Sequence, residues 1–292
     1  YKGGPVPGFP AGATWSRLRI QGIGATGQVL VGGYAVAGGE VTTGNDEALW
    51  LWTPDAGFAL VAREGGAAPD AAATPLGADL QLLNYVFNGQ LDGAGRVAFS
   101  AWIKTGATTQ VGGLFGPDAS GTLRLLAQQG QALPGMKAGS AFQGMAEAAM
   151  SDQGRLFGSS TTSKYVDDAT GVILGPGATG ALEGLYTEGS TAPGTSLAFF
   201  RLGFDTSAAV VGDSAFAFTT TAGSYWERSQ GLWVRDPDGT TRKLLVSGDP
   251  APGESDPTVL VGWYASRPVG TLSGRLAARV QLKQDAEFPR LS

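Results

Sequence analysis

The 292-residue sequence contains no cysteine and no histidine, and each absence excludes a class of chemistry. Without cysteine there are no thiolate nucleophiles, zinc–thiolate sites or disulfides; exported proteins also do without cysteine, so the compartment stays open. Without histidine there is no Ser-His-Asp or Cys-His catalytic group and no imidazole metal ligand. Any catalysis would have to use carboxylate, hydroxyl, lysine or tyrosine chemistry.

Charged residues are also scarce, at 15% of the chain against about 25% in ordinary soluble domains. The formal net charge is -5 and there is no run of Lys and Arg, so nucleic acid is not an expected partner. No apolar run approaches the roughly 18 residues of a membrane-spanning helix, so we expect no membrane span in this chain. We also expect any signal peptide to lie outside it. Glycine, in contrast, is abundant, with 47 residues that indicate many tight turns.

One short phrase recurs along the chain and ends near a proline. Its copies are YKGGPVPG at residue 1, VAREGGAAPD at 61, LAQQGQALPG at 126, LYTEGSTAPG at 185 and LVSGDPAPG at 245. Their last prolines, at intervals of 62, 65, 59 and 59 residues, are Pro7, Pro69, Pro134, Pro193 and Pro252. A fixed period of this kind is typical of a repeat architecture. It predicts a single domain of five modules, with approximate bounds 1–65, 66–130, 131–189, 190–248 and 249–292.

Each complete module is predicted to hold four strands. The first follows the proline, the second has the apolar alternation of GRVAFSA at residue 95, and the last two form a hairpin like LWLWTPDAGFALVA at 49. Residues 87–90, FNGQ, give an Asn-Gly turn signal between the first two strands of module two. Residues 141–150, AFQGMAEAAM, have helix propensity, but the repeat places a first strand there, and we follow the repeat.

Most tryptophans fit this pattern as core residues. Trp50 and Trp233 fall at the module position that Phe115 and Ile173 occupy elsewhere, which indicates packing rather than binding. Trp15 and Trp263 lie on predicted first strands, where core packing is also expected.

Four-stranded meanders of this size expose apolar surface on both faces, so each must stack on its neighbours. Radial stacking of such sheets is a β-propeller. We therefore predict an all-β fold, a five-module β-propeller, in preference to a linear β-solenoid or a pair of sandwiches. The phrase would cross from the last strand of one blade to the first strand of the next. There the proline would end strand pairing, and tight turns with positive φ are expected at Gly8, Gly135, Gly194 and Gly253.

The last module is predicted to be incomplete. After Pro252 the sequence supplies a first strand, TVLVGWYAS, and a second, RLAARVQL, but no third or fourth. The second strand would keep an unpaired edge, which invites strand addition. We expect either a fragment of a longer repeat protein or a subunit whose open edge is covered by another chain, with self-association as one route.

The stretch LDGAGRVAF, with Asp92, Gly95, Ala98 and Phe99, is followed downstream by a GDPAPG phrase at residues 248–253. Together they resemble the bacterial exported tandem-repeat proteins known by an N-x-x-G-x-x-A-F repeat. The resemblance runs along the whole chain, although Asp92 replaces the leading Asn and the other modules keep little beyond Gly and apolar alternation. It implies an exported, extracellular or cell-surface bacterial protein of unknown molecular role, and it supplies no catalytic residue.

The connections between second and third strands differ in length and chemistry, and loops on a rigid scaffold commonly carry function. Tyr225 and Trp226 lie in one such loop without counterparts in other modules, which makes them the best aromatic platform for a sugar ring or a partner. The alternative is a loop tryptophan that folds back on its own protein. The other candidate ligand-binding residues are Tyr165, Asp167 and Asp168, in the corresponding loop of module three.

Acidic residues are candidates for two kinds of site. Glycoside hydrolysis needs two carboxylates about 5 to 10 Å apart, and the candidate pairs are Asp46 with Glu47, Asp167 with Asp168, and Glu254 with Asp256. The predicted inner strands are nearly uncharged, which disfavours a catalytic pair at a propeller axis. Asp236 and Asp238 have the oxygen chemistry for calcium, yet DPDG is also an ordinary turn.

These observations predict a non-enzymatic, exported repeat protein that acts as a structural or ligand- and partner-binding module. We expect no cofactor, no metal and no catalytic residue. The expected partner is a glycan or a protein surface. The alternative is a carbohydrate-active propeller enzyme that uses carboxylates in the manner of a glycoside hydrolase.

Overall fold

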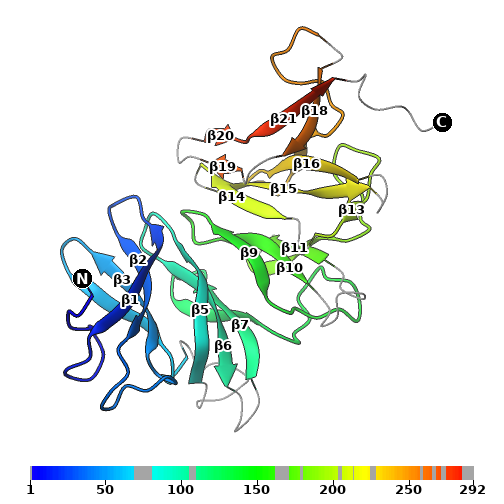
Figure 1. The fold of residues 1–292 in the computed structure, drawn as a ribbon. Coiled ribbons are helices and arrows are strands. Elements are labelled where there is room, and N and C mark those ends of the chain that lie inside the picture. The colour runs from blue at the N-terminus through cyan, green and yellow to red at the C-terminus, as the bar shows by residue number, and fades with distance from the viewer. Residues whose placement is uncertain are drawn as a thin grey trace. The chain divides into compact units, whose positions relative to one another are not determined.

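The structure is a computed structural model, and its strands are shown in Figure 1. The residues that it describes are 2–68, 81–104, 110–161, 171–177, 180–202, 206–212, 214–223, 228–256, 259–264, 268–270 and 274–284. The chain forms two compact units. The first comprises Tyr1–Leu133, Ala141–Met145 and Asp152–Arg155; the second comprises Pro134–Ser140, Ala146–Ser151 and Leu156–Ser292.

The first unit contains two antiparallel four-stranded meanders. Their strands follow chain order, β1-β2-β3-β4 and β5-β6-β7-β8. The bounds of the first sheet are β1 Trp15–Ile23, β2 Val29–Ala35, β3 Glu47–Thr53 and β4 Gly57–Arg63. Those of the second are β5 Gln81–Leu91, β6 Val97–Lys104, β7 Gln110–Pro117 and β8 Leu123–Gln128.

The second unit contains two more sheets of the same kind. One has the strands β9 Met145–Met150, β10 Leu156–Thr161, β11 Gly171–Pro176 and β12 Leu182–Thr187, again as a meander. The other has β13 Phe199–Phe200, β14 Ser207–Val211, β15 Ala215–Gly223, β16 Arg228–Arg235 and β17 Thr241–Val246. Here the first strand is in two pieces, because β13 and β14 both pair with β15.

Module five is shorter. Its strands are β18 Val259–Tyr264, β19 Val269–Gly270, β20 Leu276–Ala277 and β21 Val280–Gln284. β18 pairs with β21 and β19 with β20, so the module is one interrupted hairpin. β18 lies in the predicted first strand, β20 and most of β21 lie in the predicted second strand, and β19 lies between the two. In the described part of the chain this module is shorter than the four complete ones, but it has four short strands where two were predicted.

Every complete module has a β-bulge at the same place in its last hairpin. The register between the third and fourth strands shifts at Leu49/Trp50, Leu114/Phe115, Ile173/Leu174 and Leu232/Trp233. The position of Trp50 and Trp233 is therefore filled in module three by Leu174, and the prediction of Ile173 there is wrong by one residue. The bulge is common to all four modules, so the error lies in aligning VIL of β11 with LWL of β3 by residue type alone, whereas the strand pairing matches Leu174 to Trp50.

The bulge also fixes which side chains share a face. We call the face of each sheet that carries Trp50, Phe115, Leu174 or Trp233 its front face. The back face is the opposite face, and it carries the residue that precedes each of these four in the sequence. Successive residues of a strand point to opposite faces. The four front-face side chains at this position are buried, at 0% exposure.

Within each unit, the back face of one sheet packs on the front face of the next. In unit one, Leu30 and Leu49 from the first sheet share a core with Phe99 and Phe115 of the second, whose rings stack 5.0 Å apart. In unit two, Phe157 of β10 stacks on Phe216 of β15, with ring centroids 4.9 Å apart. The back face of the β13–β17 sheet, at Leu232 and Val234, meets Leu276 and Ala278 of module five.

The repeated phrase is the first arm of a small hairpin. Its first glycine donates a backbone hydrogen bond to the start of the next sheet, as Gly189 N does to Phe199 O (2.9 Å) and Gly248 N to Val261 O (2.8 Å). Pro250 lies in a β-bridge with Leu260. The phrase thus leaves one sheet and pairs at once with the first strand of the next, and this pairing ends directly before the last proline, since Pro7, Pro193 and Pro252 each begin the turn.

The tips of these hairpins have the predicted backbone. All four glycines lie outside strands with positive φ, of 78°, 75°, 72° and 84° at Gly8, Gly135, Gly194 and Gly253. The tip then lies against the front face of its own sheet. Trp50 Nε1 donates to Pro7 O at 2.9 Å, and Trp233 Nε1 donates to Pro193 O at 3.0 Å. The indole groups thus satisfy a turn carbonyl while their rings fill the core.

Two local expectations have different outcomes. Residues 145–150 form β9, so the repeat correctly overruled helix propensity there. Residues 87–90 lie inside β5, with register shifts at Leu83/Phe87 and Phe87/Gln90, so the Asn-Gly turn is wrong. The strand absorbs the irregularity as bulges, and the chain turns at residues 92–96 instead.

Candidate functional site

The five residues predicted to bind a ligand belong to connections between second and third strands. Tyr165, Asp167 and Asp168 fall between β10 and β11, and Tyr225 and Trp226 fall between β15 and β16. All five lie outside the described residues. Of the aromatic residues assigned to the core instead, Trp15, Trp50 and Trp233 are at most 4% exposed, which confirms that assignment. The side chain of Trp263 is also outside the described part.

In the first sheet the equivalent connection, residues 36–46, is described. Asn45 organises it: its Oδ1 accepts from Thr42 N at 2.8 Å, and its Nδ2 donates to Glu40 O at 3.1 Å. The carbonyl of Asn45 accepts from Arg63 Nε of β4 at 3.1 Å, while Val41 is buried beneath the loop. The loop is therefore fixed to its sheet and presents the exposed polar side chains of Glu40 and Thr42 to solvent.

In three of the phrases, the polar residue before the first glycine accepts a hydrogen bond from an amide near the start of the third strand. Glu64 Oε2 accepts from Glu47 N at 3.4 Å, Gln129 Oε1 from Gly112 N at 3.1 Å, and Glu188 Oε2 from Gly171 N at 3.0 Å. Each pair is separated by 17 residues. These buried or half-buried groups serve the fold, because they satisfy a strand amide. The sequence signal that could have identified them is a Glu, Gln or Ser at a fixed place before glycine.

The candidate acidic pairs are placed as follows. Asp46 and Glu47 lie at the start of β3, and Glu47 is buried with its amide bonded to Glu64. Glu254 and Asp256 lie on the exposed tip of the fifth phrase hairpin. Within the described ranges no group of three or more His, Cys, Asp or Glu residues could hold a metal ion.

Asp236 and Asp238 close the β16–β17 turn. Asp236 Oδ2 accepts from Arg242 Nε at 2.9 Å, and Asp238 Oδ1 accepts from Thr240 N at 2.8 Å. The hydrogen bond from the Thr240 amide is the main cause that lowers the pKa of Asp238 below its usual value. The geometry is that of an ordinary turn rather than a calcium site, since both carboxylates already accept donors from their own hairpin.

The β7–β8 turn repeats this chemistry with Asp118. Its Oδ1 accepts from Ser120 Oγ (2.6 Å), Ser120 N (2.8 Å) and Thr122 N (3.0 Å), and its Oδ2 from Arg124 Nε (3.2 Å). The Ser120 hydroxyl is the main cause that lowers the pKa of Asp118 to about 2. The carboxylate stays ionised because four donors favour its charged form.

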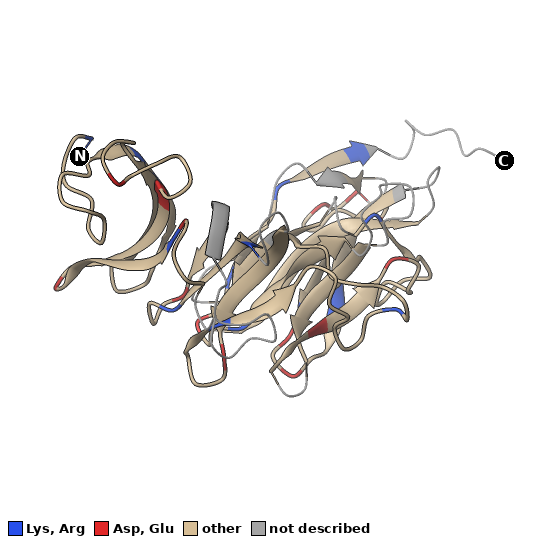
Figure 2. Ribbon diagram, turned by 90° about the horizontal axis from the view of Figure 1, so that it is seen from below, with Lys and Arg blue, Asp and Glu red and all other residues tan. Residues whose placement is uncertain are grey.

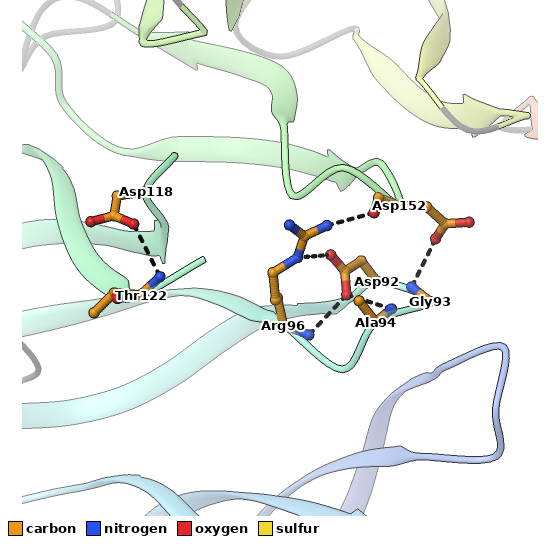
Figure 3. A network of polar contacts seen from close by, with 7 residues as sticks. All are labelled: Asp92, Gly93, Ala94, Arg96, Asp118, Thr122 and Asp152. Atoms are coloured by element: carbon orange, nitrogen blue, oxygen red, sulfur yellow. Dashed lines mark hydrogen bonds and ion pairs between the residues drawn. The ribbon is translucent and has the colours of Figure 1, made fainter. Parts of the chain in front are cut away.

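A carboxylate–guanidinium network lies in the turns between first and second strands (Figure 3). The Asp92 side chain is fully buried; its Oδ1 accepts from Ala94 N and Arg96 N at 3.0 and 2.8 Å, and its Oδ2 from Arg96 Nε at 2.6 Å. Arg96 also donates to Asp152 O, and Gly93 N donates to Asp152 Oδ1 at 2.7 Å. The network joins the β5–β6 turn to the β9–β10 turn.

The residues on which the family resemblance rests have structural roles in this network or in the strand that follows it. Asp92 caps the turn, Gly95 has a φ of 84°, and Ala98 and Phe99 are 1% exposed in the core. Each therefore has a structural role. Charged residues elsewhere follow the same trend: Figure 2 shows the strands of the four-stranded sheets largely without charge and many charged residues on turns and strand ends.

In the described part of the chain, no helix has the length and apolar character to cross a membrane. No curated protein matches the chain. Among solved structures, one match is a GH43 β-1,3-galactosidase with galactodeoxynojirimycin, at 10% identity and a TM-score of 0.31, over 81% of this chain and 78% of that one. A family model described as a family of unknown function (DUF7453) matches residues 1–136 and again residues 127–285. These two overlapping matches extend over nearly the whole sequence, and the chain belongs to this family of unknown function, as a protein with internal repeats.

Proposed function

We propose that the chain is a non-enzymatic binding or structural module, in which repeated sheets carry variable loops. One observation carries the proposal: the polar groups that recur from module to module serve the backbone, as Glu64, Gln129 and Glu188 do at the third strands. The connections between second and third strands do not recur. They run from Ala35 to Glu47 in the first sheet but only from Gly223 to Arg228 in the fourth. Variation on a constant frame is typical of binding loops.

The frame in this proposal is a β-propeller, with the sheets as blades. The packing order inside each unit supports it, since the same back face meets the same front face from sheet to sheet. Small-angle X-ray scattering tests it. A compact propeller of 292 residues should have a radius of gyration near 19 Å, roughly the value for a globular chain of this length. A linear array of sheets would give a markedly larger value.

The partner in this proposal is a glycan or a protein surface. Tyr225 and Trp226 would offer ring faces, and the carboxylates of Asp167 and Asp168, with the Tyr165 hydroxyl, would accept or donate hydrogen bonds to hydroxyl groups. The resemblance to exported repeat proteins supports an exported, extracellular or cell-surface location, and fractionation of the native cells would test it.

A glycan array probed with the purified chain tests the loop assignment. We expect Trp226→Ala to abolish binding and Trp226→Phe to keep part of it, because phenylalanine retains a ring face. Retention of full binding by both Trp226→Ala and Tyr225→Ala would contradict the assignment to this loop.

The same glycans, incubated with the chain and analysed for released products, separate binding from catalysis. Binding without product supports the module. Product release that Glu254→Gln or Asp256→Asn abolishes would instead establish a carbohydrate-active enzyme.

Self-association through the last module is a further part of the proposal. Among the described strands, β21 pairs only with β18, so its other edge has the geometry for strand addition. Gln281→Pro would remove an amide from this strand, and sedimentation would show whether association depends on it.

A further inference from the structure

The second strand of module five is exposed where the other second strands are buried. In each complete module the second strand lies between the first and the third, and its residues are mostly buried, as in β6 and β15. Among the described strands, β21 pairs only with β18, and its residue Leu282 is 44% exposed. Both strands and the phrase hairpin before them belong to unit two, so the site that they form lies within one compact unit.

Leu282 has equivalents in two complete modules. Three first-strand residues share one position, because each accepts a backbone hydrogen bond from the first glycine of its phrase: Trp15, Phe199 and Val261. Their partners in the second strand are Ala35, Ala222 and Leu282. Ala35 and Ala222 are at most 2% exposed, and Ala35 N donates to Asp46 O, directly before the third strand, at 2.8 Å. Leu282 therefore lies where a third strand would begin its pairing.

The backbone of Leu282 points to this open edge. Val261 uses its own polar groups for the phrase, because it donates to Asp249 O and accepts from Gly248 N, both at 2.8 Å. In an antiparallel pair, residues directly opposite each other point their polar groups either toward one another or away from one another. The N–H and carbonyl of Leu282, opposite Val261, therefore point away from β18 and can pair with one more strand.

The tip of the fifth phrase hairpin is open as well. In three complete modules a Cβ on the tip glycine would lie at most 3.1 Å from the fourth strand, at Leu60, Gly184 or Lys243. On Gly253 it would meet nothing within 4 Å. Module five therefore has open space at the place that a fourth strand occupies elsewhere.

The complete modules show which side chain fits between the tip and the first strand. Trp50 packs edge-on against Trp15, with ring centroids 4.5 Å apart, and its indole donates to Pro7 O at the tip. Trp233 makes the equivalent contacts in module four. In module five Val261 takes the place of Trp15, and the hairpin is formed. The matching segment is therefore an extended strand that carries a tryptophan.

The described third strands of this chain do not supply that segment. Each of β3, β7, β11 and β16 lies between a second and a fourth strand, so both of its edges are paired. A second copy could pair its own β21 with this edge, but the sequence of β21, VQLKQ, contains no aromatic residue. Pairing of two β21 strands would leave the tryptophan position beside the tip unfilled.

We propose that module five binds an extended segment of another polypeptide, which adds along β21 as a third strand and places a tryptophan against the fifth hairpin tip. The inference rests on the proposed binding function and names the partner of one edge, and it uses none of the variable loops. Main-chain hydrogen bonds to β21 would give affinity, and the tryptophan would give selectivity.

A peptide with the sequence of residues 228–246 tests the proposal, because it contains the third and fourth strands of module four with their turn. Fluorescence anisotropy of the labelled peptide, titrated with the purified chain, should show saturable binding at micromolar concentrations. The Trp233→Ala version of the peptide should bind on the order of 10-fold more weakly, because it loses a ring face and an indole donor. No binding, or equal binding of both peptides, would overturn the proposal.

Two variants of the chain locate the binding edge. Leu282→Ser should weaken binding of the peptide on the order of 10-fold, from the lost burial of a branched side chain. Val269→Ser is the matched control, because Val269 is an exposed apolar residue (61%) of the same module that lies in β19. It should leave the affinity unchanged. Weaker binding by Val269→Ser with full binding by Leu282→Ser would contradict the assignment to β21.

Hydrogen exchange needs no variant. The amide of Leu282 should exchange quickly in the free chain and become protected when the peptide is added. Protection in the monomeric chain without peptide would show that the chain fills this edge itself, and would overturn the proposal. Dimers that Gln281→Pro abolishes, in a chain that ignores the peptide, would also overturn it and leave self-association standing. The glycan array with Trp226→Ala tests the loop function independently.

Discussion

The phrase glycines provide a graded test of how closely each hairpin tip approaches its sheet. Gly253, Gly194 and Gly135 have similar positive φ values, of 84°, 72° and 75°. Their surroundings differ. A Cβ at Gly253 would meet nothing within 4 Å, one at Gly194 would lie 3.1 Å from Lys243 Cβ, and one at Gly135 would lie 2.1 Å from the backbone oxygen of Gly184.

Alanine at these positions should therefore destabilise the chain in a fixed order. Gly253→Ala should lower the free energy of unfolding by about 1–2 kcal/mol, the cost of a left-handed backbone for an L-residue. Gly194→Ala should cost slightly more, because Lys243 Cβ at 3.1 Å must give way by only a few tenths of an ångström. Gly135→Ala adds a clash with backbone that cannot move without the hydrogen bond from Gly184 N to Pro134 O (2.7 Å), so we expect about 3–5 kcal/mol.

Urea unfolding followed by circular dichroism and tryptophan fluorescence gives the three values from one protocol. All three variants are glycine-to-alanine changes at similar φ, so the cost of the left-handed backbone is the same in each. The order of the three free-energy losses therefore reports how closely each hairpin tip approaches its neighbouring atoms. Equal losses for Gly253→Ala and Gly135→Ala would refute the argument that the module-three tip lies against β12.

Three further predictions concern named polar groups. Asp92→Ala should lower the free energy of unfolding by about 2–4 kcal/mol, because it leaves Arg96 and two turn amides without their buried acceptor, whereas Asp92→Asn should cost less; urea unfolding compares them. Trp50→Phe and Trp233→Phe should each cost about 1 kcal/mol or more, since both lose an indole hydrogen bond to a proline carbonyl, and equal stability to wild type would contradict this. In the folded state the pKa of Asp118 is lowered from 3.8 to about 2, so its ionised form stabilises the fold above pH 3.8, and this contribution is lost as the pH falls towards 2. An NMR titration of Asp118 should show the low midpoint. Asp118→Asn should remove this part of the pH dependence of stability.

The sequence predicted the module period and most strands because those depend on local pattern. Turn glycines, apolar alternation and the phrase recur at one spacing, and the structure places a meander at each complete copy. The same pattern placed β9 correctly against its helix propensity, since a first strand is needed to pair with β10. Tertiary pairing there outweighs a local preference of a few tenths of a kcal/mol per residue, roughly the spread of helix propensities.

The errors come from features that one strand does not reveal by itself. The position of Leu174 is set by its pairing with the neighbouring strands, which the residue types along β11 do not show. The Asn-Gly pair in β5 has the residue types of a hairpin turn, but the Asp92 carboxylate, with its three hydrogen bonds, specifies the turn four residues later. The candidate ligand residues fall between named strands but outside the described residues, so the role of Tyr225 and Trp226 stays a prediction.

Residues that recur from module to module serve the fold, so function should be sought among residues that do not recur. Each residue that repeats with the phrase has a structural role, because the polar residue before the glycine binds a strand amide, the glycine adopts positive φ, and the residue before the last proline is buried, as Ala192 and Ala251 are. A carboxylate such as Glu188 would look functional in a single module, yet its equivalents at the same place show that it holds the third strand. Residues without equivalents have no such explanation. The loop with Trp226 is therefore a better target for mutagenesis than any of the repeated acids.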